Sequence, residues 1–138
     1  MSVDFLDSNV FVYLFDDTDL KKRARAETLV SSALADSSGV ISYQVVQETI
    51  NVLTRKLGAP PDDITRFLDA VLAPLWRVAP SPALYRRALE LHGRYGFSYY
   101  DSLIVAAALH AGCDRLMSED LQSGQSIGSL VISNPFAD

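Results

Sequence analysis

Four acidic residues stand where buried segments of this 138-residue chain are expected to end or turn. Asp7 and Asp120 follow short apolar runs typical of strands, whereas Glu48 and Asp101 fall in apolar stretches with helical spacing. Side chains that follow parallel strands gather at one edge of the sheet. We therefore expect the four carboxylates to share one site, and oxygen-only sites of this kind suit a metal ion.

Carboxylates gathered without a counter-charge repel one another. Two unit charges about 4 Å apart repel by about 4 kcal/mol at an effective dielectric near 20. Several such pairs would rival the stability of a small domain, so the site must either take up protons or hold cations. Oxygen ligands without His or Cys favour a hard ion such as Mg²⁺ or Mn²⁺. Such an ion acidifies a water and stabilises a departing oxygen, so the set could hydrolyse a phosphodiester.

Each of these acids also has a simpler interpretation. An Asp that directly follows a strand, such as Asp7, or opens a helix, such as Asp101, commonly caps that helix. Glu48 lies in a largely apolar helix and needs either a solvent-facing position or a cation, which periodicity does not decide. Only the four together favour a metal site. His92 and His110 have no His or Cys near them in sequence, so we expect surface or half-buried residues rather than zinc ligands.

Short apolar segments alternate with longer segments of helical periodicity along the chain. We expect strands at residues 3–6, 40–41, 76–79, 115–117 and 130–132. Between them the apolar spacing predicts helices, including a buried one at residues 99–111 that is apolar on every side. Parallel strands need long crossovers, which helices supply. The sequence therefore predicts an α/β fold with a mainly parallel sheet of about five short strands.

Composition favours one compact domain over residues 1–138, because 49% of the residues are hydrophobic. The longest apolar run, residues 103–109, is too short to cross a bilayer, and no basic segment precedes an apolar one at the N-terminus. The single cysteine, Cys113, cannot form an internal disulfide. These features predict a cytoplasmic protein without a membrane partner.

The net charge of −5 has the wrong sign for a simple nucleic-acid coat. Setting aside the four acidic residues removes most of this excess, and bound cations would reverse the local sign. A polyanionic substrate is therefore not excluded. Phosphates could contact basic residues 21–23 with Arg25, 55–56 and 86–87, although a solvated helix face is the simpler interpretation of each. Tyr99 and Tyr100 could stack on a base, or pack in the core or a dimer interface.

The order of the motifs resembles a known family. The chain opens with Phe5-Leu6-Asp7-Ser8-Asn9, Glu48 follows in a helix, and Tyr100-Asp101-Ser102 begins the buried helix. A late strand then leads into Leu116-Met117-Ser118-Glu119-Asp120-Leu121-Gln122. Over essentially the whole chain this pattern resembles the PIN-domain ribonucleases, most closely the VapC-type toxins of bacterial and archaeal toxin–antitoxin pairs.

The resemblance implies a PIN-like three-layer α/β/α sandwich and a metal-dependent RNA endonuclease. It implies that the catalytic residues and ligands of Mg²⁺ or Mn²⁺ are Asp7, Glu48, Asp101 and Asp120. Asn9 and Ser118 match polar positions that support the site. Glu119 stands beside Asp120, which leaves open which of the two coordinates the metal directly. The resemblance further implies an RNA substrate, a homodimer, and a cognate antitoxin that covers the site, with DNA contacted only through that antitoxin.

Three other functions fit the same residues. A non-catalytic protein-interaction module would keep the acidic site as a docking surface for an Arg-bearing partner. A PIN-like RNA-processing nuclease would share the chemistry without belonging to a toxin–antitoxin pair. A phosphatase acting on small phosphoesters would use an Asp nucleophile, but it would need a basic residue beside a later strand, and the sequence offers no convincing Lys for that role.

Overall fold

The structure of the protein is a computed structural model that describes residues 2–137. The described residues form a six-stranded sheet whose strands are β1 (Asp4–Leu6), β2 (Gly39–Ser42), β3 (Trp76–Val78), β4 (Arg115–Met117), β5 (Ser126–Ile127) and β6 (Leu130–Ser133). The helical segments are α1 (Ser8–Val12), the 3-10 turn η1 (Tyr13–Phe15), α2 (Leu20–Ala35), α3 (Tyr43–Arg55), α4 (Pro61–Phe67), the π-helical η2 (Leu68–Leu72), α5 (Ala73–Leu75), α6 (Pro82–Tyr95) and α7 (Tyr99–His110).

The strands lie in the order β3-β2-β1-β4-β6-β5. All neighbours pair in parallel except β5, which forms an antiparallel hairpin with β6. The predicted mainly parallel sheet is confirmed, and the five expected strands are all present. The sixth, β5, is only two residues long, too short for a hydrophobic pattern to reveal it.

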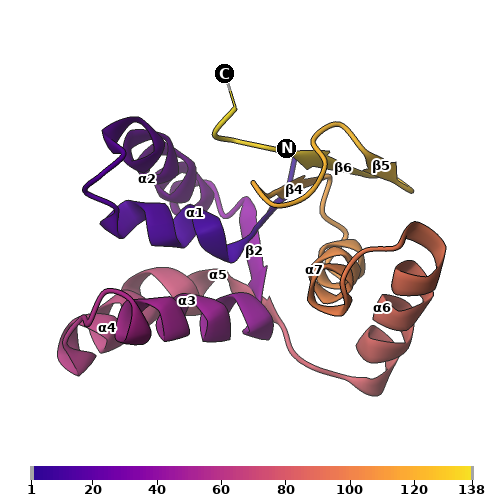
Figure 1. The fold of residues 1–138 in the computed structure, drawn as a ribbon, viewed down its shortest axis with the longest axis horizontal. Coiled ribbons are helices and arrows are strands. Elements are labelled where there is room, and N and C mark those ends of the chain that lie inside the picture. The colour runs from indigo at the N-terminus through magenta and orange to yellow at the C-terminus, as the bar shows by residue number, and fades with distance from the viewer. Residues whose placement is uncertain (1, 138) are drawn as a thin grey trace.

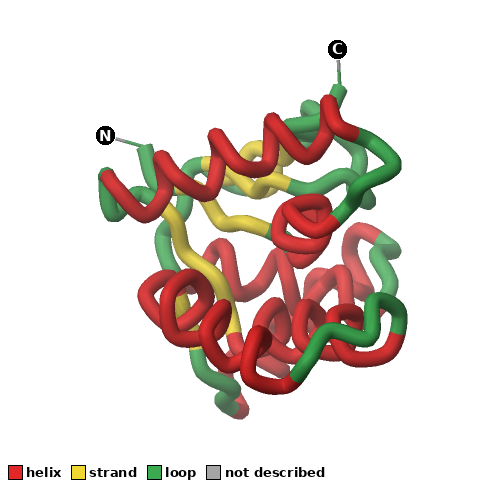
Figure 2. The backbone as a smooth tube through the Cα atoms, turned by 90° about the vertical axis from the view of Figure 1, so that its left-hand side faces the viewer, coloured by secondary structure: helices red, strands yellow, loops and turns green. Residues whose placement is uncertain are grey.

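Helices cover both faces of the sheet, which gives the three-layer α/β/α arrangement. Figure 1 shows α6 and α7 on one side of the strands and α1 to α5 on the other, and Figure 2 shows the strands between these helices from the side. Helix α7 lies between the sheet and α6, so residues 102–108 are all buried. This explains why its sequence is apolar in every direction. No helix of the described residues is long and apolar enough to span a membrane.

Strand β1 is the centre of the fold. It pairs with β2 on one side and β4 on the other, and its Phe5 and Leu6 are fully buried. At its amino end, the Asp4 carboxylate accepts two hydrogen bonds of 2.8 Å from Arg115 of β4. At its carboxyl end, the Asp7 N–H donates to the Met117 carbonyl at 3.0 Å. The residue that follows β1 is thereby fixed beside the residues that follow β4.

Gly39 offers a direct test of how closely α2 approaches the sheet. A Cβ atom built on Gly39 would lie 2.6 Å from the Ala33 Cβ and 3.3 Å from the Leu75 Cδ2. We expect Gly39→Ala to lower the free energy of unfolding by roughly 1–3 kcal/mol through overpacking. The matched control is Gly93→Ala in α6, where a Cβ meets nothing within 4 Å; it should stabilise by about 0.5–1 kcal/mol. Urea denaturation measures both, and equal effects would contradict the close approach.

Candidate metal centre

Asp7 lies directly after β1 and caps α1. Its Oδ1 accepts a hydrogen bond from the Ser8 N–H at 2.7 Å, and its Oδ2 accepts one from the Ser118 hydroxyl at 2.7 Å. The residue is only 5% exposed. Asp7 therefore caps α1 and, because it directly follows β1, also lies at the carboxyl edge of the sheet.

The surroundings of Asp7 disfavour its charge. The pKa of Asp7 is raised to about 6 in total: burial raises it most, the hydrogen bonds from Ser118 and Ser8 lower it, and the negative charges of Glu48 and Asp120 raise it. Among residues 2–137, no basic side chain forms a hydrogen bond or ion pair with Asp7. The site thus places a buried carboxyl beside two other acids without a protein counter-charge.

Glu48 faces Asp7 from α3. Its Oε2 accepts a hydrogen bond from the Ser8 hydroxyl at 3.0 Å, and its Oε1 accepts one from the Gln44 amide at 2.7 Å. The same Gln44 amide donates to the carbonyl of Tyr100 at 3.1 Å, which joins α3 to the start of α7. Glu48 is half-buried and held toward Asp7 instead of extending into solvent.

Asp120 joins the site from the loop after β4. Its N–H donates to the Ser118 hydroxyl at 3.2 Å, and its Oδ2 accepts from the Asn9 amide at 3.3 Å. Asn9 and Ser118 therefore connect α1 to this loop. The Asn9 Oδ1 is buried and accepts no hydrogen bond. An acceptor oxygen without a donor, beside three acids, is the arrangement that a cation or an ordered water would complete.

Glu119 points away from these residues. Its carboxylate accepts hydrogen bonds from the Tyr13 hydroxyl at 2.5 Å and from the Lys22 ammonium at 2.8 Å. Burial raises its pKa, but the bonds from Lys22 and Tyr13 outweigh that effect and lower it below the ordinary value. Glu119 already has its counter-charge, whereas Asp120 faces the other acids. This contact anchors the loop to α2 and η1.

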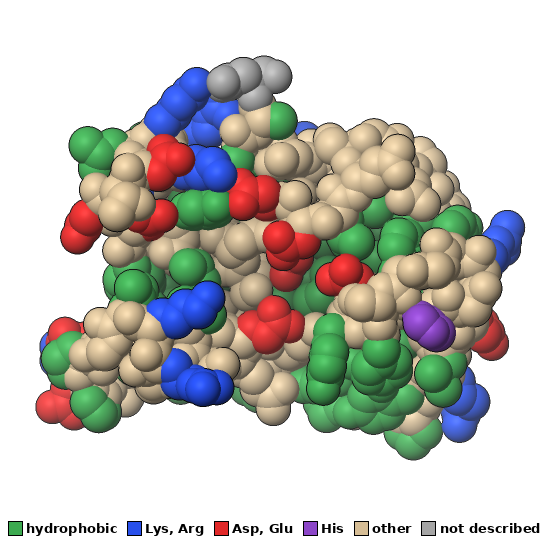
Figure 3. All heavy atoms as spheres, viewed as in Figure 1, with side chains coloured by type: hydrophobic (Ala, Val, Ile, Leu, Met, Phe, Trp, Pro, Cys, Tyr) green, Lys and Arg blue, Asp and Glu red, His purple; other side chains and the backbone are tan. Residues whose placement is uncertain are grey.

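Asp101 lies in the first turn of α7, as the sequence predicts. Its N–H donates to the Ser98 hydroxyl at 3.1 Å, so Ser98 is the helix cap. The start of α7, which carries Asp101, is joined to Glu48 through the Gln44 amide, which donates to both Glu48 and the carbonyl of Tyr100. Figure 3 shows acidic side chains gathered near the middle of one face, where α1, α3 and the start of α7 approach one another.

The donor set fits a hard divalent cation, because it consists of carboxylate oxygens and one amide oxygen. The residues that would hold such an ion are Asp7, Glu48, Asp120 and, from α7, Asp101. Within residues 2–137, however, no three acidic, His or Cys side chains are already close enough together to hold a metal. Binding therefore requires some of these side chains to turn inward.

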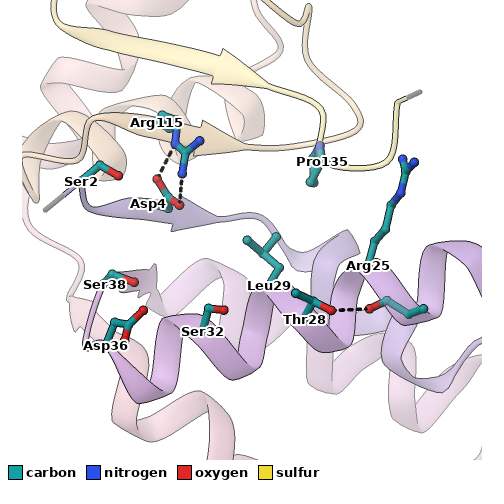
Figure 4. A pocket seen from close by; sticks show the side chains of 11 residues that line it. Ser2, Asp4, Arg25, Thr28, Leu29, Ser32, Asp36, Ser38, Arg115 and Pro135 are labelled. Carbon is teal, nitrogen blue, oxygen red and sulfur yellow. Dashed lines mark hydrogen bonds and ion pairs between the residues drawn. The ribbon is translucent and has the colours of Figure 1, made fainter.

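The other polar residues singled out in the sequence lie elsewhere. His92 and His110 are exposed, as expected, and His92 Nδ1 contacts the carbonyl of Phe97 at 2.5 Å. The largest described cavity, of about 650 Å³, lies at the opposite edge of the sheet, between α2 and the amino ends of β1 and β4 (Figure 4). Asp4 and Arg115 border it as a completed ion pair. This cavity is remote from the acidic site.

Sequence reasoning missed three contributors to the site: Gln44, Lys22 and Tyr13. The sequence could have indicated Gln44, because residues four apart on a helix share a face and Gln44 precedes Glu48 by four. No sequence pattern could have indicated Lys22 and Tyr13, because only the fold brings them to Glu119, across 97 and 106 positions of sequence. A local pattern cannot report such contacts.

Comparisons with known proteins agree with this fold. A model of the PIN domain family matches residues 5–122. VapC20 of Mycobacterium tuberculosis, described as a sarcin–ricin loop cleaving toxin, is 21% identical with a TM-score of 0.62, covering 85% of this chain and 91% of its own. A toxin–antitoxin complex from Klebsiella pneumoniae matches at 19% identity and a TM-score of 0.68, over 96% and 97%. FitAcB from Neisseria gonorrhoeae matches at 18% identity and a TM-score of 0.62, over 97% and 99%. No curated protein sequence matches.

The raised pKa of Asp7 predicts a pH-dependent effect of Asp7→Asn. The folded protein holds the Asp7 proton more tightly than the unfolded chain, because the pKa of Asp7 is raised from its ordinary 3.8 to about 6. The free energy of unfolding therefore falls as pH rises from about 4 to about 6. We expect Asp7→Asn to be more stable than wild type at pH 8 by about 3 kcal/mol, at 1.36 kcal/mol per pH unit, and not at pH 4. Urea denaturation in chelator measures this, and a difference independent of pH would contradict it.

The different surroundings of Glu119 and Asp120 predict different roles. Asp120→Asn should weaken Mn²⁺ binding by about 10-fold or more, because it removes a charge that faces Asp7. The matched control, Glu119→Gln, should bind Mn²⁺ nearly as wild type does and lose up to about 1 kcal/mol of stability with the Lys22 pair. Calorimetric titration with Mn²⁺ distinguishes them, and the opposite ranking would assign the ligand to Glu119.

Proposed function

We propose that this chain, which belongs to the PIN domain family, is a divalent-metal-dependent RNA endonuclease and the toxin of a toxin–antitoxin pair. One observation carries the proposal. Asp7 is buried at the end of the central strand, two further acids raise its pKa, and no basic side chain compensates it. A cation at this point would remove the electrostatic cost and supply the reactive centre.

Mg²⁺ or Mn²⁺ bound among these acids would acidify a water for attack on the RNA backbone and stabilise the departing oxygen. The chain's own residues hold the ligands in place. Ser118 and Ser8 fix the two oxygens of Asp7. Asn9 orients Asp120, and Gln44 orients Glu48. Asp101 supplies a fourth carboxylate from the first turn of α7, and no side-chain nucleophile is required.

RNA is the proposed substrate. VapC20, which shares the fold, is described as a toxin that cleaves the sarcin–ricin loop. Figure 3 shows Lys and Arg side chains beside the acidic group, on the side of the molecule formed by α2 to α4. Exposed Arg55 and Lys56 at the end of α3 are available for backbone phosphates. In contrast, Lys22 and Arg23 on α2 already pair with carboxylates.

The proposed partner is a cognate antitoxin that covers the acidic site, in keeping with the toxin–antitoxin complex of the same fold from Klebsiella pneumoniae. An acidic site attracts a basic segment, and an Arg inserted among these carboxylates would compensate the charge that the metal otherwise compensates. We further propose that the protein is a single domain over residues 1–138, that it forms a homodimer and that it is cytoplasmic. DNA would be contacted only through the antitoxin.

Cleavage of a structured RNA by wild type and two variants tests the proposal. We expect wild type to cleave with Mg²⁺ or Mn²⁺ and to stop with chelator. Asp7→Asn and Asp101→Asn should each lower the rate by about 100-fold or more, since each removes charge that holds the metal. The matched control is Asp36→Asn, an exposed acid that borders the cavity at the opposite edge, which should cleave as wild type does.

Two outcomes would contradict the proposal. Equal cleavage by all variants, or cleavage that survives chelation, would point to a contaminating nuclease. No cleavage with any ion, together with tight binding of a basic partner in chelator, would identify a non-catalytic interaction module.

A further inference from the structure

A small hollow adjoins Glu48 on the side of α7. It has a volume of about 350 Å³ and is lined by Gln44, Gln47, Glu48 and Tyr100. We propose that this hollow binds one unpaired RNA base beside the phosphodiester to be cut, an inference that rests on the proposed function. Three features of the wall of the hollow indicate which kind of group it binds.

The first feature is the ring of Tyr100, which is 68% exposed at the rim of the hollow. Tyr99 contacts the ring edge-on, with centroids 5.6 Å apart and an interplanar angle of 66°, and the backbone carbonyl of Tyr100 accepts a hydrogen bond from Gln44. An aromatic face open to solvent is the surface on which unpaired bases stack in RNA-binding proteins.

The second feature is the chemistry of the opposite wall, which comes from α3. The Gln44 amide is committed to Glu48 and to the carbonyl of Tyr100, so it fixes the shape of the hollow. Gln47 is exposed, and its amide offers both a donor and an acceptor to the edge of a base. No Lys or Arg lines the hollow, and Glu48 makes it acidic. A phosphate or carboxylate is therefore a poor occupant, whereas an uncharged, flat, polar-edged group fits.

The third feature is continuity with the candidate metal centre. Glu48 forms a wall of the hollow and accepts a hydrogen bond from the Ser8 hydroxyl, while the backbone N–H of the same Ser8 donates to Asp7. A phosphodiester held at the carboxylates therefore places its neighbouring nucleotide next to Tyr100. Figure 3 shows hydrophobic side chains beside the acidic group, over α6 and the start of α7. Tyr85 and Leu89 are exposed on α6, and contact between two copies of the chain through this helix is an outcome that the experiment below distinguishes.

Steady-state cleavage of a single-stranded oligoribonucleotide in Mn²⁺ tests the proposal. Tyr100→Ala should raise KM about 10-fold or more, the size of a lost base stack, with a smaller change in kcat. Tyr100→Phe keeps the ring and should retain the wild-type KM. Tyr85→Ala, outside the hollow, is the control and should also retain it. An oligonucleotide with one abasic position should raise KM for wild type by the same factor and leave Tyr100→Ala unaffected.

Three outcomes would overturn the proposal. If Tyr100→Ala keeps the wild-type KM, the hollow does not bind a base, while the proposed nuclease activity still stands. A dimeric wild type with monomeric Tyr100→Ala and Tyr85→Ala variants in sedimentation, both defective, would assign the surface to contact between copies. Absence of any metal-dependent cleavage by wild type would overturn the proposed function and this inference together.

Discussion

The charge of Asp7 is the constraint on which the site depends. The carboxylate is buried at the end of the central strand and faces Glu48 and Asp120, so its negative form is unfavourable in the protein alone. Two hydrogen bonds, from Ser118 and Ser8, compensate part of that cost. The remainder must be met by a proton, a cation or a basic partner. This requirement would let one site serve both the proposed metal-dependent cleavage and the proposed inhibition by a basic segment.

Sheet topology makes the constraint possible. Because β1 and β4 are parallel neighbours, the residues that follow them emerge together, and Ser118 meets Asp7 across 111 positions of sequence. Glu48 comes from α3 and contacts Ser8 of α1. Gln44, also on α3, donates a hydrogen bond to the carbonyl of Tyr100 at the start of α7. On the far side of the loop, Glu119 binds Lys22 and Tyr13. The loop that carries Asp120 is thus held at Ser118 and Glu119, the two residues that precede Asp120, and Asp120 itself is exposed.

Much of this arrangement could be predicted from sequence because its signals are local. Strand–helix alternation predicted the parallel sheet, and the all-apolar segment predicted buried α7. The choice between Glu119 and Asp120 could not be made, since adjacent residues differ only in what the fold places opposite each of them. The short strand β5 and the Lys22 contact depend equally on tertiary structure.

The most direct test of the account is the position of Mn²⁺ in a crystal of the protein, read from anomalous scattering. We predict a peak bounded by the Asp7 carboxylate and at least one of Glu48, Asp101 and Asp120, at the ~2.0–2.6 Å distances of oxygen ligands to hard cations, and no such peak in Asp7→Asn. Two results would contradict the account: Mn²⁺ bound only elsewhere on the surface, or a site that stays empty at saturating Mn²⁺ because Asp7 carries a proton instead.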